Sequence, residues 1–182
     1  MCGKCTGTNT PKLDLTRSFF TYEGTVAQLI KGLKYGKDLT CLRAILELAT
    51  PILPSLLKEL PPKACDLSET CVIPVPLHKR RLKSRGFNQS LLIAKGLFPT
   101  MKICTLTVQK TVDTRPQSSL TGKERAKNIK GAFDIKKSPL PSSYFILVDD
   151  VVTTGSTLRE IAKLLKKNGA KGVCALTIAR TI

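Results

Sequence analysis

Residues 145–157 read FILVDDVVTTGST, an apolar run of β-forming residues followed by two adjacent acids and a loop of hydroxyl side chains around one glycine. A helical pattern begins directly after this stretch, so we expect a strand, a tight loop and a helix in that order. In open parallel sheets, ligands bind beyond the carboxyl ends of strands, where loops lead into helices. The stretch therefore predicts a ligand site at the end of a strand.

The loop has the composition of a phosphate-binding turn. Hydroxyl groups come from Thr153, Thr154, Ser156 and Thr157, and Gly155 allows the backbone to turn closely around a ligand. The helix that follows adds unpaired N–H groups and the positive end of its dipole. In the alternative interpretation Ser156 only caps this helix, which explains one hydroxyl but not four together with two acids and a glycine. We therefore predict a phosphate cradle.

The two acids, Asp149 and Asp150, require a different partner. As hydrogen-bond acceptors they suit the diol of a sugar, and they also suit a position close to a hydrated Mg²⁺ ion. A ribose 5-phosphate moiety carries both a diol and a phosphate. We therefore expect the two acids to bind ribose hydroxyls while residues 153–157 bind the 5-phosphate.

Strand and helix patterns alternate along most of the chain. Apolar strands that alternate with helices indicate an α/β fold with an open, mainly parallel sheet flanked by helices. We expect strands at residues 71–75, 102–108, 144–150 and 172–178. We expect helices within residues 25–36, at 39–60 with breaks at Pro51 and Pro54, at 89–98 and at 156–168.

The 182 residues give room for one domain, which we place at residues 13–182, with residues 1–12 as a tail or the remnant of a small module. No apolar run reaches the roughly 20 residues that cross a bilayer, and the start lacks the apolar region of a signal peptide. We therefore expect no membrane insertion and a cytoplasmic location. The seven cysteines stand mostly singly in apolar contexts, which predicts reduced thiols and no disulfide framework.

The chain is strongly basic, with 30 Lys and Arg residues against 13 acids and a formal charge of +17, so it should attract phosphorylated metabolites or nucleic acid. The densest cluster of basic residues is PVPLHKRRLKSRGFNQS at residues 74–90. We expect a basic turn here, directly after the strand expected at residues 71–75. We expect it to bind a pyrophosphate, and a solvated loop or a nucleic-acid patch are the alternatives. The residues assigned to this role are His78, Lys79, Arg80 and Arg81.

A second polar stretch, TRPQSSLTGKERAKNIKGAF, occupies residues 114–133. Long charged connections in compact domains are usually functional, and this one could close over bound substrates as a lid. The residues that we assign to such a lid are Arg115, Gln117, Lys123 and Arg125.

Residues 145–157 closely resemble the signature with which type I phosphoribosyltransferases bind phosphoribosyl pyrophosphate (PRPP). Taken with residues 74–90, residues 114–133 and YEGTVAQLIKGLKYGKD at 22–38, the chain looks like the ComF/GntX family, a phosphoribosyltransferase-like branch that includes competence factors for DNA uptake. The resemblance implies the type I fold, PRPP as ligand, Mg²⁺ held chiefly through PRPP, and partners in the DNA-uptake machinery.

The family usually bears an N-terminal zinc finger of two C-x-x-C pairs, whereas this chain has one such pair, Cys2 and Cys5. One pair cannot close a tetrahedral four-cysteine zinc site. We therefore expect a vestigial or truncated finger.

Several activities fit this pattern. As an enzyme, the chain would transfer the ribose phosphate of PRPP to a nitrogenous acceptor, which the sequence does not identify. The alternatives are a PRPP sensor without turnover, a single-stranded DNA-binding partner in DNA uptake, and a nucleobase-salvage transferase. The +17 charge favours the DNA-binding alternative, whereas salvage needs a base pocket that the sequence does not locate.

Overall fold

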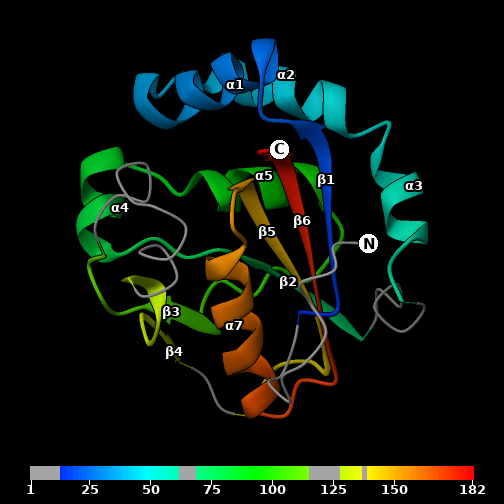
Figure 1. Cartoon of the computed structure of the whole chain (residues 1–182), viewed down its shortest axis with the longest axis vertical. Coiled ribbons are helices and arrows are strands. Elements are labelled where there is room, and N and C mark those ends of the chain that lie inside the picture. The colour runs from blue at the N-terminus through cyan, green and yellow to red at the C-terminus, as the bar shows by residue number, and fades with distance from the viewer. Residues whose placement is uncertain (1–12, 62–68, 115–127, 137–138) are drawn as a thin grey trace.

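The computed structural model describes residues 13–61, 69–114, 128–136 and 139–182. Its centre is a four-stranded sheet in the order β1-β6-β5-β2, in which every neighbouring pair is parallel (Figure 1). The strands are β1 (Leu15–Thr21), β2 (Thr70–Pro74), β5 (Tyr144–Val152) and β6 (Gly172–Arg180). The α/β fold with an open parallel sheet is therefore confirmed, as are three of the four expected strands.

The strand expected at residues 102–108 is wrong in extent. Only Ile103 continues the main sheet, through one parallel bridge to Val72. The chain then turns away, and β3 (Val108–Lys110) pairs antiparallel with β4 (Phe133–Ile135) in a separate small sheet. The two short extended segments looked like one strand in the sequence, because both are apolar and no glycine or proline separates them.

Two cysteines also depart from the sequence-based expectation. Cys71 and Cys104 form a disulfide, with their Cα atoms 6.2 Å apart. The bridge between Val72 and Ile103 brings the two chain segments together, which the sequence alone does not reveal. The expectation of reduced thiols fails for this pair, whereas Cys174 is a buried, reduced cysteine as expected.

The edge strand β1 was not predicted. Its sequence, LTRSFFT, is half-buried along its whole length and lacks a strict alternation of apolar and polar residues. Pairing with β6, which begins at Leu15 opposite Cys174, satisfies its backbone. The strand therefore forms because a partner edge is present and not because of its own pattern.

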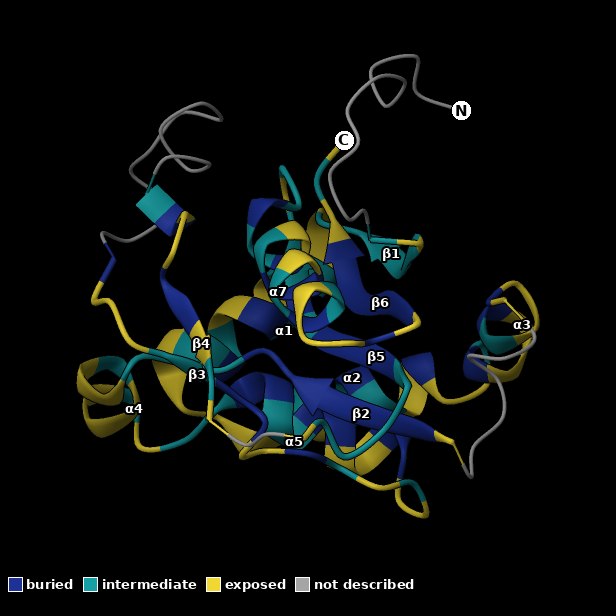
Figure 2. Ribbon diagram, turned by 90° about the horizontal axis from the view of Figure 1, so that it is seen from below, coloured by how far each residue is buried: buried dark blue, intermediate teal, exposed yellow. Residues whose placement is uncertain are grey.

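Helices cover both faces of the sheet, and Figure 2 shows the buried strands between them. The helices are α1 (Gly24–Lys31), the π-helix η1 (Gly32–Gly36), α2 (Leu39–Ala49), α3 (Leu53–Lys58), α4 (Lys79–Arg85), α5 (Gln89–Leu97) and α7 (Ser156–Lys167). Ile146 and Val148 of β5 face the core beneath α1, α2 and α5, whereas Phe145 and Leu147 face the core beneath α7. This alternation is the two-residue period of a strand.

Most of these helices lie where the sequence places them. The break expected at Pro51 separates α2 from α3, whereas Pro54 lies in the first turn of α3 and does not break it. The helix after the hydroxyl loop begins at Ser156. Across the described ranges, no helix is both long and apolar enough to cross a membrane.

Candidate functional site

The acid segment, residues 149–157, runs from the end of β5 into α7. Asp149 and Asp150 lie inside β5, because the strand continues to Val152 instead of ending at the acids. A small concavity follows, lined by Asp149 and by residues 151–158. The structure therefore brings the first acid and the hydroxyl loop to one place.

Only one of the two carboxylate oxygens of Asp149 accepts hydrogen bonds from the described residues. Its Oδ1 accepts a hydrogen bond of 2.8 Å from the Ser90 hydroxyl of α5 and one of 2.9 Å from the Asp150 N–H. Burial and the charge of Asp150 raise the pKa of Asp149 to about 7, although Lys34 and Ser90 oppose the rise. Among the described residues, no hydrogen-bond donor meets Oδ2 of Asp149. This oxygen is therefore available to a ligand.

Both carboxylate oxygens of Asp150 have a partner, and the residue is only 4% exposed. Its Oδ1 accepts from the Val151 N–H at 2.6 Å, and the Lys34 Nζ lies 2.9 Å from its Oδ2. Among the described residues, Lys34 is the one side chain that contacts this Oδ2. The two acids, which looked equivalent in the sequence, are thus in different environments.

The hydroxyl loop turns at Gly155, whose φ of +69° lies in the left-handed region that favours glycine. Thr153 is exposed, whereas the Thr154 and Ser156 hydroxyls lie 3.0 Å apart beside the concavity. The Thr154 carbonyl accepts a 2.6 Å hydrogen bond from the Arg159 guanidinium. Arg159 therefore braces the loop from the first turn of α7.

The helix cap differs from the alternative interpretation of this loop. Gly155 occupies the N-cap position of α7 without a side-chain cap, and Ser156 is already the first helical residue. Ser156 therefore does not serve as the N-cap, and capping does not account for the row of hydroxyls. The N-terminal turn of α7 faces the concavity with its positive dipole end.

The basic segment, residues 78–85, is a helix and not the turn that the sequence suggested. His78 is its N-cap and accepts from the Arg80 N–H at 3.4 Å, so a short helix replaces the expected loop. Asp113 lies 3.5 Å from both the His78 Nδ1 and the Arg80 guanidinium. Lys79 and Arg80 are exposed, whereas Arg81 turns inward.

Two half-buried cations, Arg81 and Lys110, lie together at Thr114. Arg81 donates to the Thr114 carbonyl at 2.7 Å, and Lys110 of β3 donates to the Thr114 hydroxyl at 2.7 Å. Burial and the charge of Arg81 lower the pKa of Lys110 to about 8, against the opposing charges of Asp113 and Asp149. Lys110 therefore lies within the field of both segments.

Sequence reasoning missed three of these residues: Lys34, Ser90 and Lys110. Ser90 and Lys34 belong to helical patterns, where a polar residue ordinarily marks a solvated face. Only tertiary structure shows that each reaches an acid of β5. The expected lid residues Arg115, Gln117, Lys123 and Arg125, and the cysteine pair Cys2 and Cys5, lie outside the described residues.

Magnesium fits this site only as a companion of a ligand. Over the ranges that the structure describes, no three His, Cys, Asp or Glu side chains gather in a way that could hold a metal ion. Mg²⁺ commonly keeps several waters and binds through one or two carboxylates together with substrate phosphates. The free Oδ2 of Asp149 beside the phosphate-type loop suits that arrangement.

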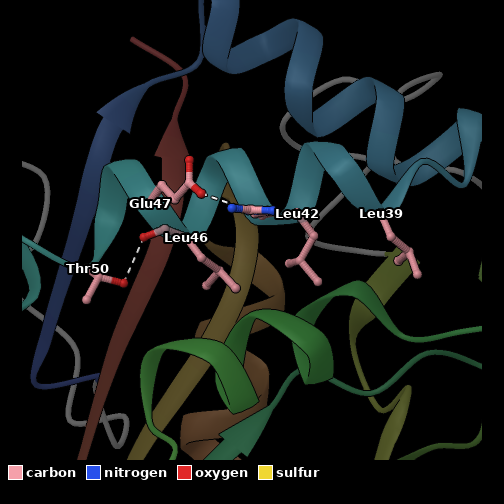
Figure 3. A pocket seen from close by; sticks show the side chains of 6 residues that line it. Leu39, Leu42, Leu46, Glu47 and Thr50 are labelled. Atoms are coloured by element: carbon pink, nitrogen blue, oxygen red, sulfur yellow. Dashed lines mark hydrogen bonds and ion pairs between the residues drawn. The ribbon is translucent and has the colours of Figure 1, made fainter.

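A separate hollow lies along α2, where Leu39, Leu42 and Leu46 point to the same side of the helix (Figure 3). Its polar lining consists of Thr50, which bonds the Leu46 carbonyl, and the ion pair of Arg43 with Glu47. These groups are already satisfied and offer no set of donors for a phosphate. The hollow is therefore not the candidate site.

Comparison with known proteins gives a family match that includes the acid segment. Residues 88–181, just over half of the chain, match the family model of the phosphoribosyl transferase domain. Competence protein F of Haemophilus influenzae is 41% identical over 113 residues, which cover 60% of this chain and 49% of the relative. DNA utilization protein YhgH of Escherichia coli is 40% identical over 113 residues, with 61% and 49% covered. The chain spans about half the length of these relatives.

Competence protein ComFC of Bacillus subtilis is 29% identical over 171 residues, which cover 91% of this chain and 64% of the relative. A hypoxanthine phosphoribosyltransferase structure from Staphylococcus aureus aligns with a TM-score of 0.40 at 16% identity, over 76% of this chain and 72% of that one. The family match, the sheet order and the relatives agree with the resemblance seen in the sequence. This chain belongs to the phosphoribosyl transferase domain family and, within it, to the ComF-type proteins.

Proposed function

We propose that the acid segment binds PRPP together with Mg²⁺. The observation that carries this proposal is the free Oδ2 of the half-buried Asp149, which lies beside a concavity lined by the hydroxyl loop of residues 153–157. An acceptor oxygen next to a row of donors matches a ribose diol next to a 5-phosphate. Asp149 and Asp150 would hold the ribose, and Thr153, Thr154, Gly155, Ser156 and Thr157 would hold the 5-phosphate.

The basic segment would bind the pyrophosphate group of PRPP. Arg81 and Lys110 repel each other, and this repulsion contributes to the lowered pKa of Lys110. A pyrophosphate between them would relieve that repulsion and would receive charge-assisted hydrogen bonds. Lys79 and Arg80 would add to the positive field at the same end of the sheet, and His78 beside them would contact the same group.

As a transferase, the chain would position an acceptor nitrogen against C1 of the ribose. A bond from that nitrogen to C1 would form as the bond from C1 to the pyrophosphate oxygen breaks, and pyrophosphate would leave with the electron pair. The cations of the basic segment would stabilise the charge that grows on the leaving group. Mg²⁺, bound chiefly by PRPP, would supply further stabilisation of that charge.

A role in DNA handling is the second candidate. It rests on α4, where Lys79, Arg80 and Lys83 are exposed on a helix without a buried residue, and on the +17 charge. Phosphate contacts by such a helix give affinity for single-stranded DNA without reading its sequence. The relatives named for competence and DNA utilization support a place for this chain in that process.

The first experiment measures Mg²⁺-PRPP binding by calorimetry and pyrophosphate release with purine and pyrimidine bases, ammonia and single-stranded DNA as acceptors. Binding that is lost in the double variant D149A/D150A, with the fold retained by circular dichroism, supports the ribose assignment. Equal binding by the double variant would contradict it. Turnover with one acceptor class would identify a transferase, whereas binding without turnover would favour a sensor.

A salt titration tests DNA binding separately. Affinity for single-stranded DNA should fall steeply between low and high salt and should be lost when Arg80, Arg81 and Lys83 are neutralised. Binding that responds to neither change would rule out this role for α4.

A further inference from the structure

A buried ion pair joins the N-terminal helical layer to the proposed ribose site. The Lys34 Nζ lies 2.9 Å from the Asp150 Oδ2, and the two side chains are 19% and 5% exposed. Lys34 belongs to η1, which lies with α1 and α2 over the carboxyl ends of the central strands (Figure 1). Ion pairs this well buried are uncommon unless both charges are satisfied.

The local backbone fixes the position of Lys34. It lies in a π-helical turn between Leu33, which is 1% exposed, and Tyr35, which is 71% exposed. A Cβ atom at Gly32 would meet the Cys41 sulfur at 2.6 Å, so α2 packs closely against the start of this turn. Such π-turns are rare and occur frequently at functional sites. The turn aims Lys34 at the sheet, while its neighbours point to the core and to solvent.

Charge keeps this pair intact. Burial lowers the pKa of Lys34, but the charge and hydrogen bond of Asp150 and the charge of Asp149 outweigh it, so its pKa is raised overall. Lys34 is therefore a cation in the free protein. In the described part of the chain, no other cation forms a salt bridge with Asp150.

The pair has a consequence for ligand binding. Asp149 and Asp150 are adjacent acids in a buried strand, and two like charges at that separation repel. Without the Lys34 contact at its Oδ2, the Asp150 carboxylate would rotate away from its present position. This rotation would remove an acceptor from the place where a ribose diol would bind.

We propose that Lys34 is a positioning residue of the ribose site, which holds the Asp150 carboxylate oriented so that the acid pair can accept hydrogen bonds from a ribose diol. This inference rests on the proposed function, since it assigns a role in the same site. It also makes the N-terminal helical layer part of the ligand site, although the family match begins only at residue 88.

The test is a double-variant cycle measured by calorimetry with Mg²⁺-PRPP. The variants are K34M, D150N, K34M/D150N, the charge-preserving K34R, and the control K31M at an exposed lysine one turn earlier. Inorganic pyrophosphate, which lacks a diol, serves as a second ligand. Circular dichroism verifies the fold, and the double variant, which removes both charges together, covers the case in which K34M does not fold.

Lys34 acting through Asp150 should give a non-additive cycle. We expect K34M to weaken PRPP binding about tenfold or more, K34R to recover most of the loss, and K34M to have no further effect in the D150N background. Pyrophosphate affinity should be unchanged in K34M, and K31M should bind PRPP as the wild type does.

Three results would overturn the inference. The first is unchanged PRPP binding in folded K34M. The second is an equal loss on adding K34M to the wild type and to D150N. The third is failure of the wild-type protein itself to bind PRPP, which would reject the proposed function together with this inference. The first two leave the proposed function standing, so the two failures are distinguishable.

Discussion

The acid segment and the basic segment of the candidate site are assembled in different ways. The acid segment is one continuous stretch, in which strand, acids, loop and helix follow each other within residues 145–157. The basic segment depends on Asp113, Lys110 and Thr114, which lie outside it and arrive from β3 and the chain that follows. The acid segment can therefore be recognised in the sequence, whereas the surroundings of the basic segment form only when the chain folds.

The segments also differ in how their charges are satisfied. Asp150 in the acid segment has a buried cation at 2.9 Å. The contacts of Asp113 with His78 and Arg80 are longer, at 3.5 Å, and Arg80 is exposed. The acid segment should therefore respond strongly to the loss of a single charge, and the basic segment weakly.

The largest effect is expected from K34M. It leaves the buried Asp150 without its cation, which should lower the free energy of unfolding by about 3–5 kcal/mol. The exposed control K31M should change it by no more than about 0.5 kcal/mol. Urea denaturation measures the free energy of unfolding of both variants. Equal values for K34M and K31M would contradict the expectation that the acid segment responds strongly to the loss of a single charge.

The pH dependence of stability should be the next largest effect. Asp149 has a folded-state pKa raised to about 7, so between its unfolded pKa and pH 7 the folded protein binds more protons than the unfolded chain. Stability from this group is therefore complete at low pH and is lost as the pH rises towards 7, by at most about 1.4 kcal/mol per pH unit. Denaturation of wild type and D149N at several pH values in Mg²⁺-free buffer tests this. A difference between the two proteins that does not change with pH would contradict it.

A smaller loss is expected from G155A. Gly155 has a φ of +69°, and a Cβ there would meet the Arg159 guanidinium at 3.1 Å, so the variant should lose about 1–2 kcal/mol of stability. The control G36A has an ordinary φ and open space around it and should be neutral. Thermal denaturation compares them. G155A should also bind PRPP more weakly, and unaltered affinity would indicate that the loop does not hold the phosphate.

The smallest effect is expected from a substitution in the basic segment, and it should strengthen ligand binding instead of weakening it. D113N frees His78 and Arg80 and removes a negative charge, so affinity for inorganic pyrophosphate should rise about two- to fivefold at low salt. Asp134 is an exposed acid of β4, and D134N is the matched control. Weaker binding by D113N would show that Asp113 positions the cations instead of competing for them.

The sequence predicted the parts of the fold that have a local pattern. The apolar strands β2, β5 and β6 and the helices α2, α5 and α7 follow from periodicity and from breaks at glycine and proline. It did not predict β1, whose stability comes from pairing with β6, or the disulfide of Cys71 with Cys104, which depends on a single bridge. It also read the basic segment as a turn, because seven residues rich in like charge have little intrinsic tendency to form a helix.

The same distinction holds within the site. Residues 149–157 were found because neighbours in sequence are neighbours in the fold. Ser90 and Lys34 were not found, because each reaches β5 from a different helix. The different roles of the two acids depend on these partners, so the sequence could identify the pair but could not tell Asp149 from Asp150.

The most direct test of the central claim compares two sugars in the same site. Ribose 5-phosphate and 2-deoxyribose 5-phosphate differ by one hydroxyl of the diol that Asp149 and Asp150 are proposed to bind. We predict that ribose 5-phosphate displaces PRPP from the wild-type protein at least about tenfold better than the deoxy sugar, because a site built for a hydroxyl rejects an analogue that lacks it. This preference should disappear in D149N. Equal displacement by the two sugars in the wild-type protein would contradict the assignment of the acids to the ribose.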